Sequence, residues 1–374
     1  MKKRIVIIRS NPVEPDSRVE KEANSLVKGG YDVQLLVWDR TRNGIYNDTK
    51  VLADTEVKRT CLGAKATYGE GIKNLRPFLL FQYRIFKWLL FHRKNFDYVH
   101  ACDFDTAFTS AIACKLLNIP YIFDIFDYIG TNPRNFVERI VNFFEHWIIN
   151  NAAGTIICTE QRKNQICGSH PKKLEIIHNS PDKIKLGSIK IKSTNDKVRI
   201  VYVGILQDYR MILELAEIVK KHPQLELHIG GFGKLEEQIR HLAEVSSNIF
   251  FYGKLSYPDT LALENQADIM TALYDPSIGN HYYAAPNKFY EALFLGKPLI
   301  MVRNTGMSQI VEEQNIGVLV DYNEKSLSKG IFELISEKEQ WTKISIKMKC
   351  IYKTAYSWKE MERRLWAFYS KLGS

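Results

Sequence analysis

The sequence lacks the patterns that mark several classes of protein. Its six cysteines form no CxxC pair and no cysteine–histidine cluster with zinc spacing, which excludes a zinc finger and a small disulfide scaffold. It has no run of about 18 uncharged apolar residues, so no transmembrane helix is expected. The loop after the first predicted strand, residues 9–23, has no GxGxxG motif, which argues against a nicotinamide site there.

The composition is that of a globular protein. The chain has 374 residues, of which 45% are hydrophobic and 25% charged, so about two domains are expected and intrinsic disorder is excluded. Lysine and arginine number 52 against 42 acidic residues, a net charge of +10. This balance fits nucleic acid, an anionic membrane surface or a phosphate-bearing substrate, and it does not choose among them.

Short apolar runs alternate with amphipathic segments in the first half of the chain. Strands are predicted at 4–8, 32–38, 97–101, 120–125 and 154–159, and helices at 17–28, 75–92, 104–117 and 135–151. Continuous apolar strands suit a parallel sheet that is buried on both faces. The alternation therefore predicts a doubly wound α/β fold.

The alternation stops in a polar, lysine-rich stretch and then restarts. Strands are predicted at 198–204, 225–231, 248–253, 267–273, 297–302 and 317–321, and helices at 210–221, 234–245, 257–265, 286–295, 305–313 and 324–335. We predict a Rossmann-like N-terminal domain at 1–182, a linker at 183–197 and a Rossmann-like C-terminal domain at 198–355. The helical spacing of apolar residues in 356–374 predicts one more helix with a single apolar stripe.

The loops at the carboxyl ends of the strands carry the candidate residues, because ligands of open parallel sheets bind there. Gly204 ends a predicted strand and Arg210 is expected to begin the next helix, where a guanidinium and free N–H groups suit an anion. A surface arginine is the alternative. Arg18 is open to the same two interpretations. The glycines at 230–233 allow close backbone packing against a ligand or a neighbouring loop.

The most informative stretch is SIGNHYYAAPNKFYEALFLGKPLIMV. Pro286 is expected to open a helix, on which Lys288 and Glu291 lie one turn apart. A glutamate on that face could accept two hydrogen bonds from a vicinal diol such as ribose. A surface salt bridge between Lys288 and Glu291 is the alternative.

At this stretch the chain resembles the family 4 glycosyltransferases, which have the GT-B fold of two Rossmann-like domains facing a central cleft. The resemblance also includes RVEKEANSLVKGGYDVQLL, FDYVHACDFDTAF, VGILQDYR and IGGFG, and so runs along most of the chain. The final SWKEMERRLWAFYSKL resembles the helix that crosses back onto the first domain of this fold.

The resemblance implies a retaining transfer of a hexose-type sugar from a nucleotide diphosphate sugar, a UDP-sugar being favoured, without a metal or other cofactor. Arg210 matches the basic residue that contacts the donor diphosphate, and Gly204 the loop that faces it. Asn287 and Lys288 match the loop near the donor sugar and phosphates. Glu291 matches the second glutamate of the Glu-x7-Glu signature, which holds the ribose. Arg210 and Lys288 are the candidate catalytic residues, because preorganised cations stabilise a leaving diphosphate.

Three positions depart from the family pattern and bear on catalytic competence. One is Leu206, which stands where the loop after Gly204 often has an arginine. Tyr283 stands where the signature has its first glutamate, and Phe126 stands near a position that often holds a histidine.

The acceptor-side candidates lie in the first domain at strand ends or near the first helix. They are Arg18, Asp103, Asp124 and Asp127. Asp103 and Asp105 form a DxD pair, for which a helix N-cap is the preferred interpretation, so no metal is assigned.

Residues 72–94 form a basic aromatic segment. They contain six lysines and arginines, no acid, and interleaved phenylalanine and tryptophan. Such a helix suits an anionic membrane surface, and the alternative is a core helix with a solvated basic rim. No RRM, KH or helix-turn-helix signature favours nucleic acid as a partner.

These observations favour a glycosyltransferase that acts on a glycan or lipid-linked acceptor in polysaccharide or glycoconjugate biosynthesis. We expect a cytoplasmic protein, peripheral at the inner face of the cell membrane. The alternatives are a nucleotide-sugar epimerase, which would keep its product on the nucleotide, and a non-catalytic GT-B subunit that partners an active enzyme.

Overall fold

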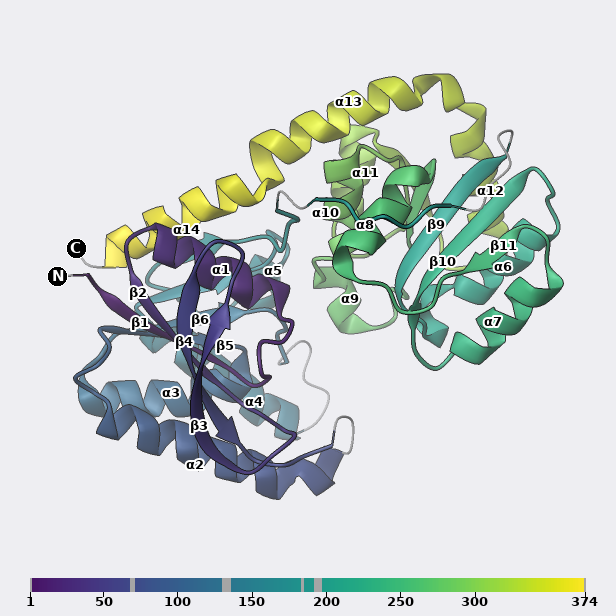
Figure 1. Ribbon diagram of the computed structural model, residues 1–374. Helices are drawn as coiled ribbons and strands as arrows, with labels where there is room; N and C mark the ends of the chain where they lie inside the picture. Colours follow the sequence, from purple (N-terminus) through teal and green to yellow (C-terminus); the bar gives the residue numbers. More distant parts are fainter. Residues whose placement is uncertain (1, 68–70, 130–135, 183–184, 192–196, 373–374) are drawn as a thin grey trace. The chain divides into compact units, whose positions relative to one another are not determined.

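A computed structural model describes residues 2–67, 71–129, 136–182, 185–191 and 197–372 (Figure 1). The chain divides into two compact units. The first consists of Met1–Asn179 together with Met361–Ser374, and the second of Ser180–Glu360. Each unit is built around its own sheet and its own core, so each is treated by itself.

The first unit contains an eight-stranded sheet in the order β3-β4-β2-β1-β5-β6-β7-β8. All neighbours pair in parallel except β3 and β4, which are antiparallel. Residues Ile5 to Ile8 of β1 are at most 1% exposed, as expected for a central strand covered on both faces. The strands are β1 (Arg4–Arg9), β2 (Asp32–Val37), β3 (Gly44–Val51), β4 (Glu56–Gly63), β5 (Tyr98–Cys102), β6 (Tyr121–Ile125), β7 (Gly154–Ile157) and β8 (Leu174–Ile176).

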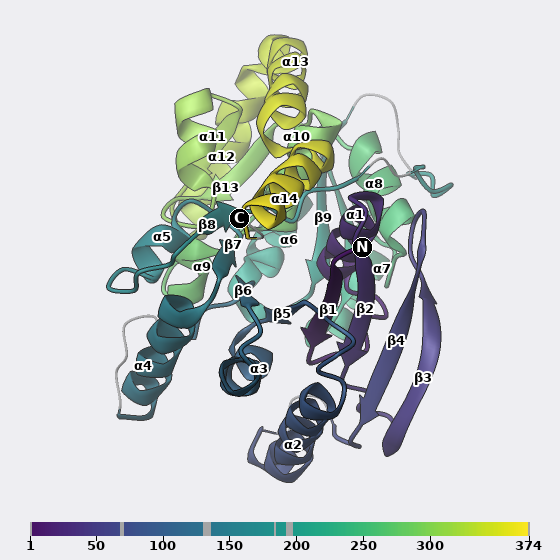
Figure 2. The same cartoon turned by 90° about the vertical axis from the view of Figure 1, so that its left-hand side faces the viewer.

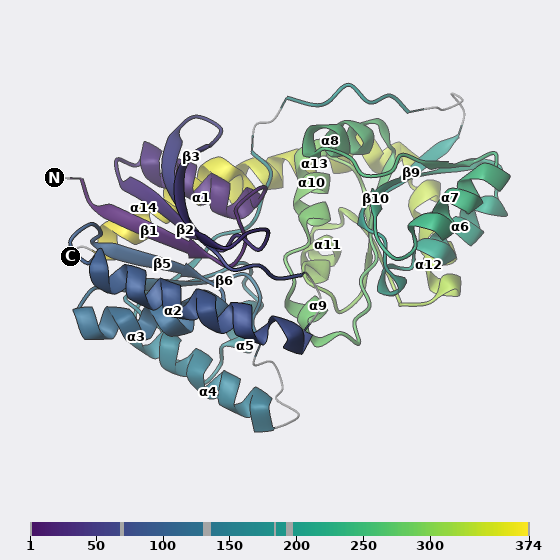
Figure 3. The same ribbon diagram turned by 60° about the horizontal axis from the view of Figure 1, so that its bottom comes forward.

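Helices cover both faces of this sheet. A layer of three helices, α2, α3 and α4, packs on one face, and the three lie side by side (Figures 2 and 3). Helix α1 begins after Asp16, whose carboxylate accepts a hydrogen bond from the backbone N–H of Val19 and caps the helix. The helical segments are α1 (Ser17–Lys28), η1 (Gly71–Asn74), α2 (Leu75–Phe91), α3 (Phe104–Leu117), α4 (Phe136–Asn151) and α5 (Arg162–Gln165).

The last helix, α14 (Trp358–Leu372), returns the chain to the first unit from Met361 onward. Trp366 Nε1 donates a hydrogen bond to the Ser25 carbonyl oxygen at 2.6 Å. The hydroxyl of Tyr369 lies 2.7 Å from His100 Nδ1. The predicted apolar stripe is buried as well, with Met361, Leu365 and Phe368 at most 2% exposed. A Cβ atom on Gly154 of β7 would lie 2.4 Å from Phe368 Cζ, so the stripe packs against the sheet.

The second unit contains a six-stranded, fully parallel sheet in the order β11-β10-β9-β12-β13-β14. Its strands are β9 (Val198–Ile205), β10 (Leu225–Phe232), β11 (Ile249–Phe251), β12 (Ile269–Ala272), β13 (Leu299–Val302) and β14 (Gly317–Val320). Its helical segments are η2 (Asp208–Arg210), α6 (Ile212–Lys220), α7 (Glu236–Val245), α8 (Tyr257–Gln266), α9 (Gly279–Tyr283), α10 (Asn287–Leu295), α11 (Ser308–Gln314), α12 (Glu324–Ser336), η3 (Lys338–Gln340), α13 (Trp341–Ile351) and the π-helical turn η4 (Tyr352–Tyr356).

Part of the segment expected to be a linker, 183–197, lies against the second unit. Of it, residues 183–184 and 192–196 lie outside the described residues. The Gly187 N–H donates to the Pro258 carbonyl oxygen at 2.9 Å, and Gln266 of α8 donates to the Ile189 carbonyl oxygen at 2.7 Å. These contacts attach residues 187–189 to α8.

The two-domain parallel α/β architecture predicted from the sequence is confirmed by these sheets. The sequence-based prediction missed the β3–β4 hairpin. Side chains of β3 alternate between half-buried and exposed, and the strand is polar, so it lacks the apolar run that marks a parallel strand. Among the described residues, no helix is long and apolar enough to cross a membrane.

Candidate functional site

Gly204 lies near the end of β9, where its missing side chain lets a lysine approach the backbone. A Cβ atom at this position would lie 2.6 Å from Lys288 Nζ, and the φ angle of Gly204 is +156°. The neighbouring strand requires glycine as well, because a Cβ on Gly231 of β10 would lie 1.9 Å from the Gly204 carbonyl oxygen. A Cβ on Gly233 would lie 2.6 Å from the carbonyl oxygen of Leu206, in the loop after β9. For Gly233, close packing against a neighbouring loop, one of the two interpretations of the sequence, is thus observed.

Arg210 lies in the same loop region, but it does not begin a helix as the sequence suggested. It ends the short turn η2, Met211 follows with a φ angle of +48°, and α6 starts at Ile212. The Arg210 guanidinium lies 3.8 Å from the centre of the Tyr274 ring. Its Nη1 atom is buried and has no hydrogen-bond partner in the described residues. An unpartnered, buried guanidinium N–H is a strong hydrogen-bond donor available to an anion.

Aromatic side chains surround this arginine. The rings of Tyr209 and Tyr274 both lie near His281, with centroid distances of 5.7 and 5.3 Å. Burial lowers the pKa of His281, and the Arg210 charge lowers it further, outweighing the opposing effect of Asp275. A neutral imidazole beside Arg210 leaves the guanidinium as the local positive charge.

Helix α10 presents the other candidate residues of this unit. Pro286 occupies the N-cap position, and the helix runs from Asn287 to Leu295. Asn287 is exposed, whereas Lys288 and Glu291 are 9% and 4% exposed. Lys288 Nζ lies 4.7 Å from the centre of the Tyr202 ring. Lys288 and Glu291 therefore lie on one buried face of α10, and the Lys288 side chain reaches Gly204.

The protonation states around Lys288 favour a retained positive charge. Burial lowers the pKa of its ammonium, but nearby Tyr274 and Tyr202 and two glutamates outweigh burial, so the pKa is raised. One of these is Glu264 of α8, which is 1% exposed. Burial and the neighbouring Glu291 raise the pKa of the Glu264 carboxyl well above its ordinary value, although Lys288 opposes them.

The structure therefore brings Gly204 and Lys288 together and places Lys288 near Glu291. Four further residues near Arg210 and Lys288 were not predicted from the sequence: Tyr202, Glu264, Tyr274 and His281. Glu264 could have been found from the sequence, because it is a charged residue on the apolar stripe of a predicted helix. Tyr274 could have been found as well, because it directly follows the end of a predicted strand. His281 lies in the stretch that was judged most informative.

Tyr283, which stands at the position of the missing glutamate, is half-buried in the short helix α9. Its ring centroid is 4.9 Å from that of Tyr282. A phenol donates and accepts hydrogen bonds but carries no negative charge at neutral pH. Any contact that it makes to a donor sugar would be a neutral hydrogen bond.

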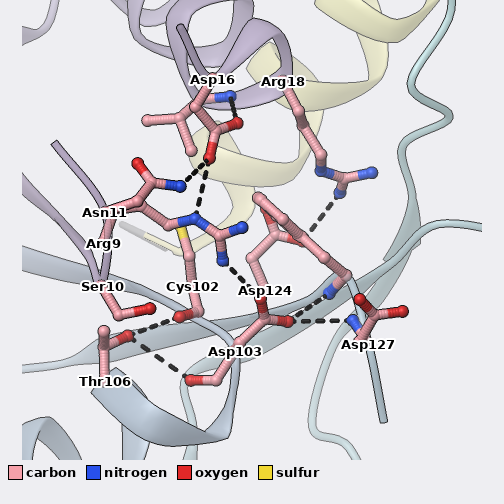
Figure 4. A network of polar contacts seen from close by, with 12 residues as sticks. Arg9, Ser10, Asn11, Asp16, Arg18, Cys102, Asp103, Thr106, Asp124 and Asp127 are labelled. Carbon is pink, nitrogen blue, oxygen red and sulfur yellow. Dashed lines mark hydrogen bonds and ion pairs between the residues drawn. The ribbon is translucent and has the colours of Figure 1, made fainter. Parts of the chain in front are cut away.

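In the first unit, Arg18 and Asp124 pair with each other (Figure 4). Arg18 Nη2 lies 2.7 Å from Asp124 Oδ1, and Arg18 Nη1 donates to the Ile177 carbonyl oxygen at 2.6 Å. Both side chains are almost fully buried, at 3% and 0% exposure. The expectation that they face an acceptor is therefore corrected, because the guanidinium and the carboxylate neutralise each other inside the unit.

Asp103 ties the end of β5 to the end of β6. Its Oδ1 accepts hydrogen bonds from the backbone N–H groups of Phe126 and Asp127 at 2.8 and 3.0 Å, and its Oδ2 accepts one from Arg9 (Figure 4). The residue occupies the N-cap position of α3, as proposed for this DxD pair, but its side chain makes no capping hydrogen bond. Burial raises the pKa of Asp103 to about 6, against the opposing effect of Arg9.

Phe126, near the position where the family often has a histidine, contacts two arginines through its ring. The guanidinium carbons of Arg9 and Arg18 lie 4.4 and 4.5 Å from its ring centre, a distance at which cation–π attraction operates. Asp127 is the most exposed of the four acceptor-side candidates, at 72% for the side chain. Its Oδ1 lies 3.4 Å from Arg162 Nη2, so the carboxylate is both exposed to solvent and paired with an arginine.

Within the described residues, one buried group has the composition of a metal site. His100, Cys102 and Asp124 each offer an atom within 4.8 Å of the others. However, both ring nitrogens of His100 are already hydrogen-bonded, Nδ1 to the Tyr369 hydroxyl and Nε2 to the Asp124 carboxylate. Arg18 neutralises the same carboxylate. Burial raises the pKa of the Cys102 thiol well above its ordinary value, so the thiolate that a metal requires is disfavoured. These residues do not fit a metal.

Comparison with known proteins matches both units to one group of enzymes. A family model described as glycosyltransferase family 4 matches residues 17–183, and one described as glycosyl transferases group 1 matches residues 197–337. The chain belongs to the family 4 glycosyltransferases. This glycosyltransferase is similar to an uncharacterized glycosyltransferase of Haemophilus influenzae, with 22% identity over 335 residues, which cover 87% of each chain.

Solved structures of GT-B enzymes share the fold of this glycosyltransferase over nearly its whole length. Sucrose-phosphate synthase of Thermosynechococcus elongatus matches with a TM-score of 0.80 and 15% identity, covering 100% of this chain and 99% of the other. HepE of Anabaena, solved with UDP and glucose, matches with a TM-score of 0.71 and 12% identity, covering 99% and 100%. At these identities the likeness establishes the GT-B fold.

Proposed function

We propose that this glycosyltransferase binds a UDP-sugar in its second unit, through Gly204, Arg210, Asn287, Lys288 and Glu291. The observation that carries the proposal is the pair of preorganised cations at the carboxyl end of β9. Among the described residues the buried Nη1 of Arg210 has no hydrogen-bond partner, and the Lys288 ammonium lies where a side chain on Gly204 would be. Two fixed cations beside accessible backbone are suited to a diphosphate.

The remainder of the nucleotide would lie toward α10. Glu291 is 4% exposed, and a buried carboxylate accepts strong hydrogen bonds from the hydroxyl groups of a ribose. The crystal complex of HepE contains UDP and glucose, which supports a UDP-sugar as the donor to test first. The sugar transferred is proposed to be a hexose.

The chemistry follows from the charge that develops during transfer. The bond between the anomeric carbon and the phosphate oxygen breaks, and its electron pair stays on the diphosphate. Arg210 and Lys288 stabilise that negative charge from positions fixed before the reaction, which is how preorganised donors lower a barrier. An acceptor hydroxyl bonds to the anomeric carbon on the face that the phosphate leaves, and its proton passes to the leaving phosphate. The anomeric configuration is thereby retained.

The acceptor is proposed to be a glycan or a lipid-linked sugar in polysaccharide or glycoconjugate biosynthesis, bound by the first unit. Asp127 and the half-buried ring of Phe126 are the accessible groups there. Because Phe126 has no ionisable group, no base is assigned to this position, and the leaving phosphate takes that role. A protein at the inner face of the cytoplasmic membrane would meet such an acceptor.

The test is incubation of the full chain with a panel of UDP-, GDP- and ADP-sugars, with and without a lipid-linked acceptor. We expect a UDP-sugar to be consumed, with slow hydrolysis in the absence of an acceptor. Thermal unfolding in the presence of UDP, GDP and ADP shows which nucleotide base the protein prefers, because a bound ligand raises the temperature of the unfolding midpoint. A nucleotide-sugar product with an altered sugar would identify an epimerase instead.

A non-catalytic subunit would give a different result. It would turn over no sugar in the panel, and either bind a nucleotide without chemistry or show no midpoint shift with any nucleotide. The absence of a shift with all three would refute donor binding at this site. Addition of EDTA is expected to leave the activity unchanged, because the two cations supply the charge that a metal would provide.

A further inference from the structure

Exposed apolar side chains are concentrated on one layer of the first unit. In the described part of the chain, 21 large apolar side chains are exposed, and eleven of them lie on the three helices of the α2–α3–α4 layer. These eleven are Leu75, Leu79, Leu80, Tyr83, Phe91, Ile112, Leu116, Phe136, Val137, Ile140 and Phe143. Scattered single residues are ordinary on a protein surface, whereas a concentration of this kind marks an interaction site.

On α2 these side chains share one face with basic residues. Tyr83 and Phe91 are 59% and 76% exposed, and Lys87 Nζ lies 6.0 and 5.8 Å from the centres of their rings. The opposite face of the helix buries Phe81 and Ile85 in the core. The alternative from the sequence, a core helix with a solvated basic rim, therefore accounts for the inner face but not for the exposed aromatic rings.

Helix α4 also exposes apolar side chains, although it was not singled out from the sequence. Phe136, Ile140 and Phe143 are 76%, 40% and 67% exposed, and their spacing of four and three residues places them on one face. Lys115 of α3 lies 5.6 Å from the Trp147 ring of α4. The outer surfaces of the neighbouring helices thus combine apolar side chains with lysine in the same way.

The exposed charged side chains on the described part of this layer are all basic. The exposed cations on and beside the three helices are Lys73, Arg76, Lys87, Arg93, Lys94, Lys115 and Arg139. In the described part of these helices no acid is exposed, since Glu145 is fully buried and Asp105 and Glu138 are half-buried. A surface of this charge is complementary to an anionic partner.

We propose that the α2–α3–α4 layer docks the protein onto an anionic lipid bilayer. Phenylalanine, tyrosine and leucine enter the boundary between headgroups and acyl chains, while lysine and arginine contact the lipid phosphates. A nucleic-acid surface would use the cations but leave the exposed phenylalanine, leucine and isoleucine side chains in water. The proposal stands apart from donor binding, because every residue named here lies outside the second unit.

Co-sedimentation with vesicles tests this surface in the full-length protein. The wild type is expected to bind vesicles of equimolar phosphatidylglycerol and phosphatidylcholine, to bind pure phosphatidylcholine far more weakly, and to be released by salt. Each basic residue near the surface contributes about fivefold to binding, so Arg76→Gln with Lys87→Gln is expected to weaken it by about 25-fold. Phe136→Ser and Phe143→Ser are each expected to weaken it by roughly tenfold.

A matched control is available on α13, where Lys343 is exposed and Ile346 is 67% exposed. Lys343→Gln with Ile346→Ser is expected to leave vesicle binding unchanged. All variants are expected to keep the thermal shift with UDP, which shows that they are folded and separates a failure of docking from a failure of the donor site.

Three results would overturn the docking proposal. One is a wild type that does not bind anionic vesicles. The second is binding by the layer variants that equals that of the wild type. The third is assignment of the face to another partner, either a DNA duplex bound in place of vesicles or a stable dimer that Phe143→Ser dissociates.

Discussion

A methyl group on Gly204 should weaken nucleotide binding by displacing Lys288. The Cβ of alanine would lie 2.6 Å from Lys288 Nζ, and ordinary contact requires 3.4 Å or more. The ammonium must therefore move by about 1 Å. For two unit charges at an effective dielectric constant of about 20, a separation that grows from about 3 to about 4 Å loses about 1.4 kcal/mol, or tenfold in affinity.

Isothermal titration with UDP measures this effect, and a double-mutant cycle assigns its cause. In a Lys288→Met background, Gly204→Ala should cost no further affinity, because the displaced charge is already absent. The positive φ angle of Gly204 adds strain that lowers stability by about 1 kcal/mol, which thermal unfolding reports separately. Gly279→Ala, where the added methyl meets no atom within 4 Å, is the control. Unchanged UDP affinity in Gly204→Ala, or an equal loss in the Lys288→Met background, would show that Gly204 does not act through the position of Lys288.

Three further predictions concern individual charges. Arg210→Ala should lower kcat by about 100- to 1,000-fold in a sugar-transfer assay, and wild-type turnover would remove Arg210 from the catalytic site. Glu291→Ala should weaken UDP binding by about 10- to 100-fold, the loss expected for hydrogen bonds to a charged group; equal calorimetric affinities would exclude a ribose contact. The Asp103 carboxyl should titrate near pH 6 by carbon NMR, against about 3.9 in an unfolded chain. Since the folded state then binds the proton more tightly, Asp103 should lower the free energy of unfolding by about 2–3 kcal/mol as the pH rises from about 4 to about 6. In Asp103→Asn this fall in the free energy of unfolding with rising pH should be absent. A titration of the Asp103 carboxyl near its ordinary pKa of about 4 would contradict the prediction.

The architecture was readable from the sequence because buried parallel strands have a simple pattern. β1 and β9 are apolar runs with helices after them, and their predicted starts at residues 4 and 198 agree with the structure. The β3–β4 hairpin was missed because its polar strands lack such a run. Pairing with a neighbouring strand, rather than local composition, makes these residues extended.

Side-chain environments in the site were less predictable. The prediction that Lys288 and Glu291 share one face of a helix was correct, because helical periodicity is a local property of the sequence. Burial of Arg18 against Asp124 joins residues 106 positions apart, so no local pattern could distinguish it from a solvated arginine. The unpartnered Nη1 of Arg210 depends on the turn before α6 and on Tyr274, which are likewise tertiary features.

The most direct test of the central claim is a crystal structure of the protein with UDP bound. We expect the diphosphate beside Arg210 and Lys288 near the end of β9, with the ribose hydroxyls on Glu291. Nucleotide density elsewhere, or a diphosphate bound while both cations point away from it, would contradict the account.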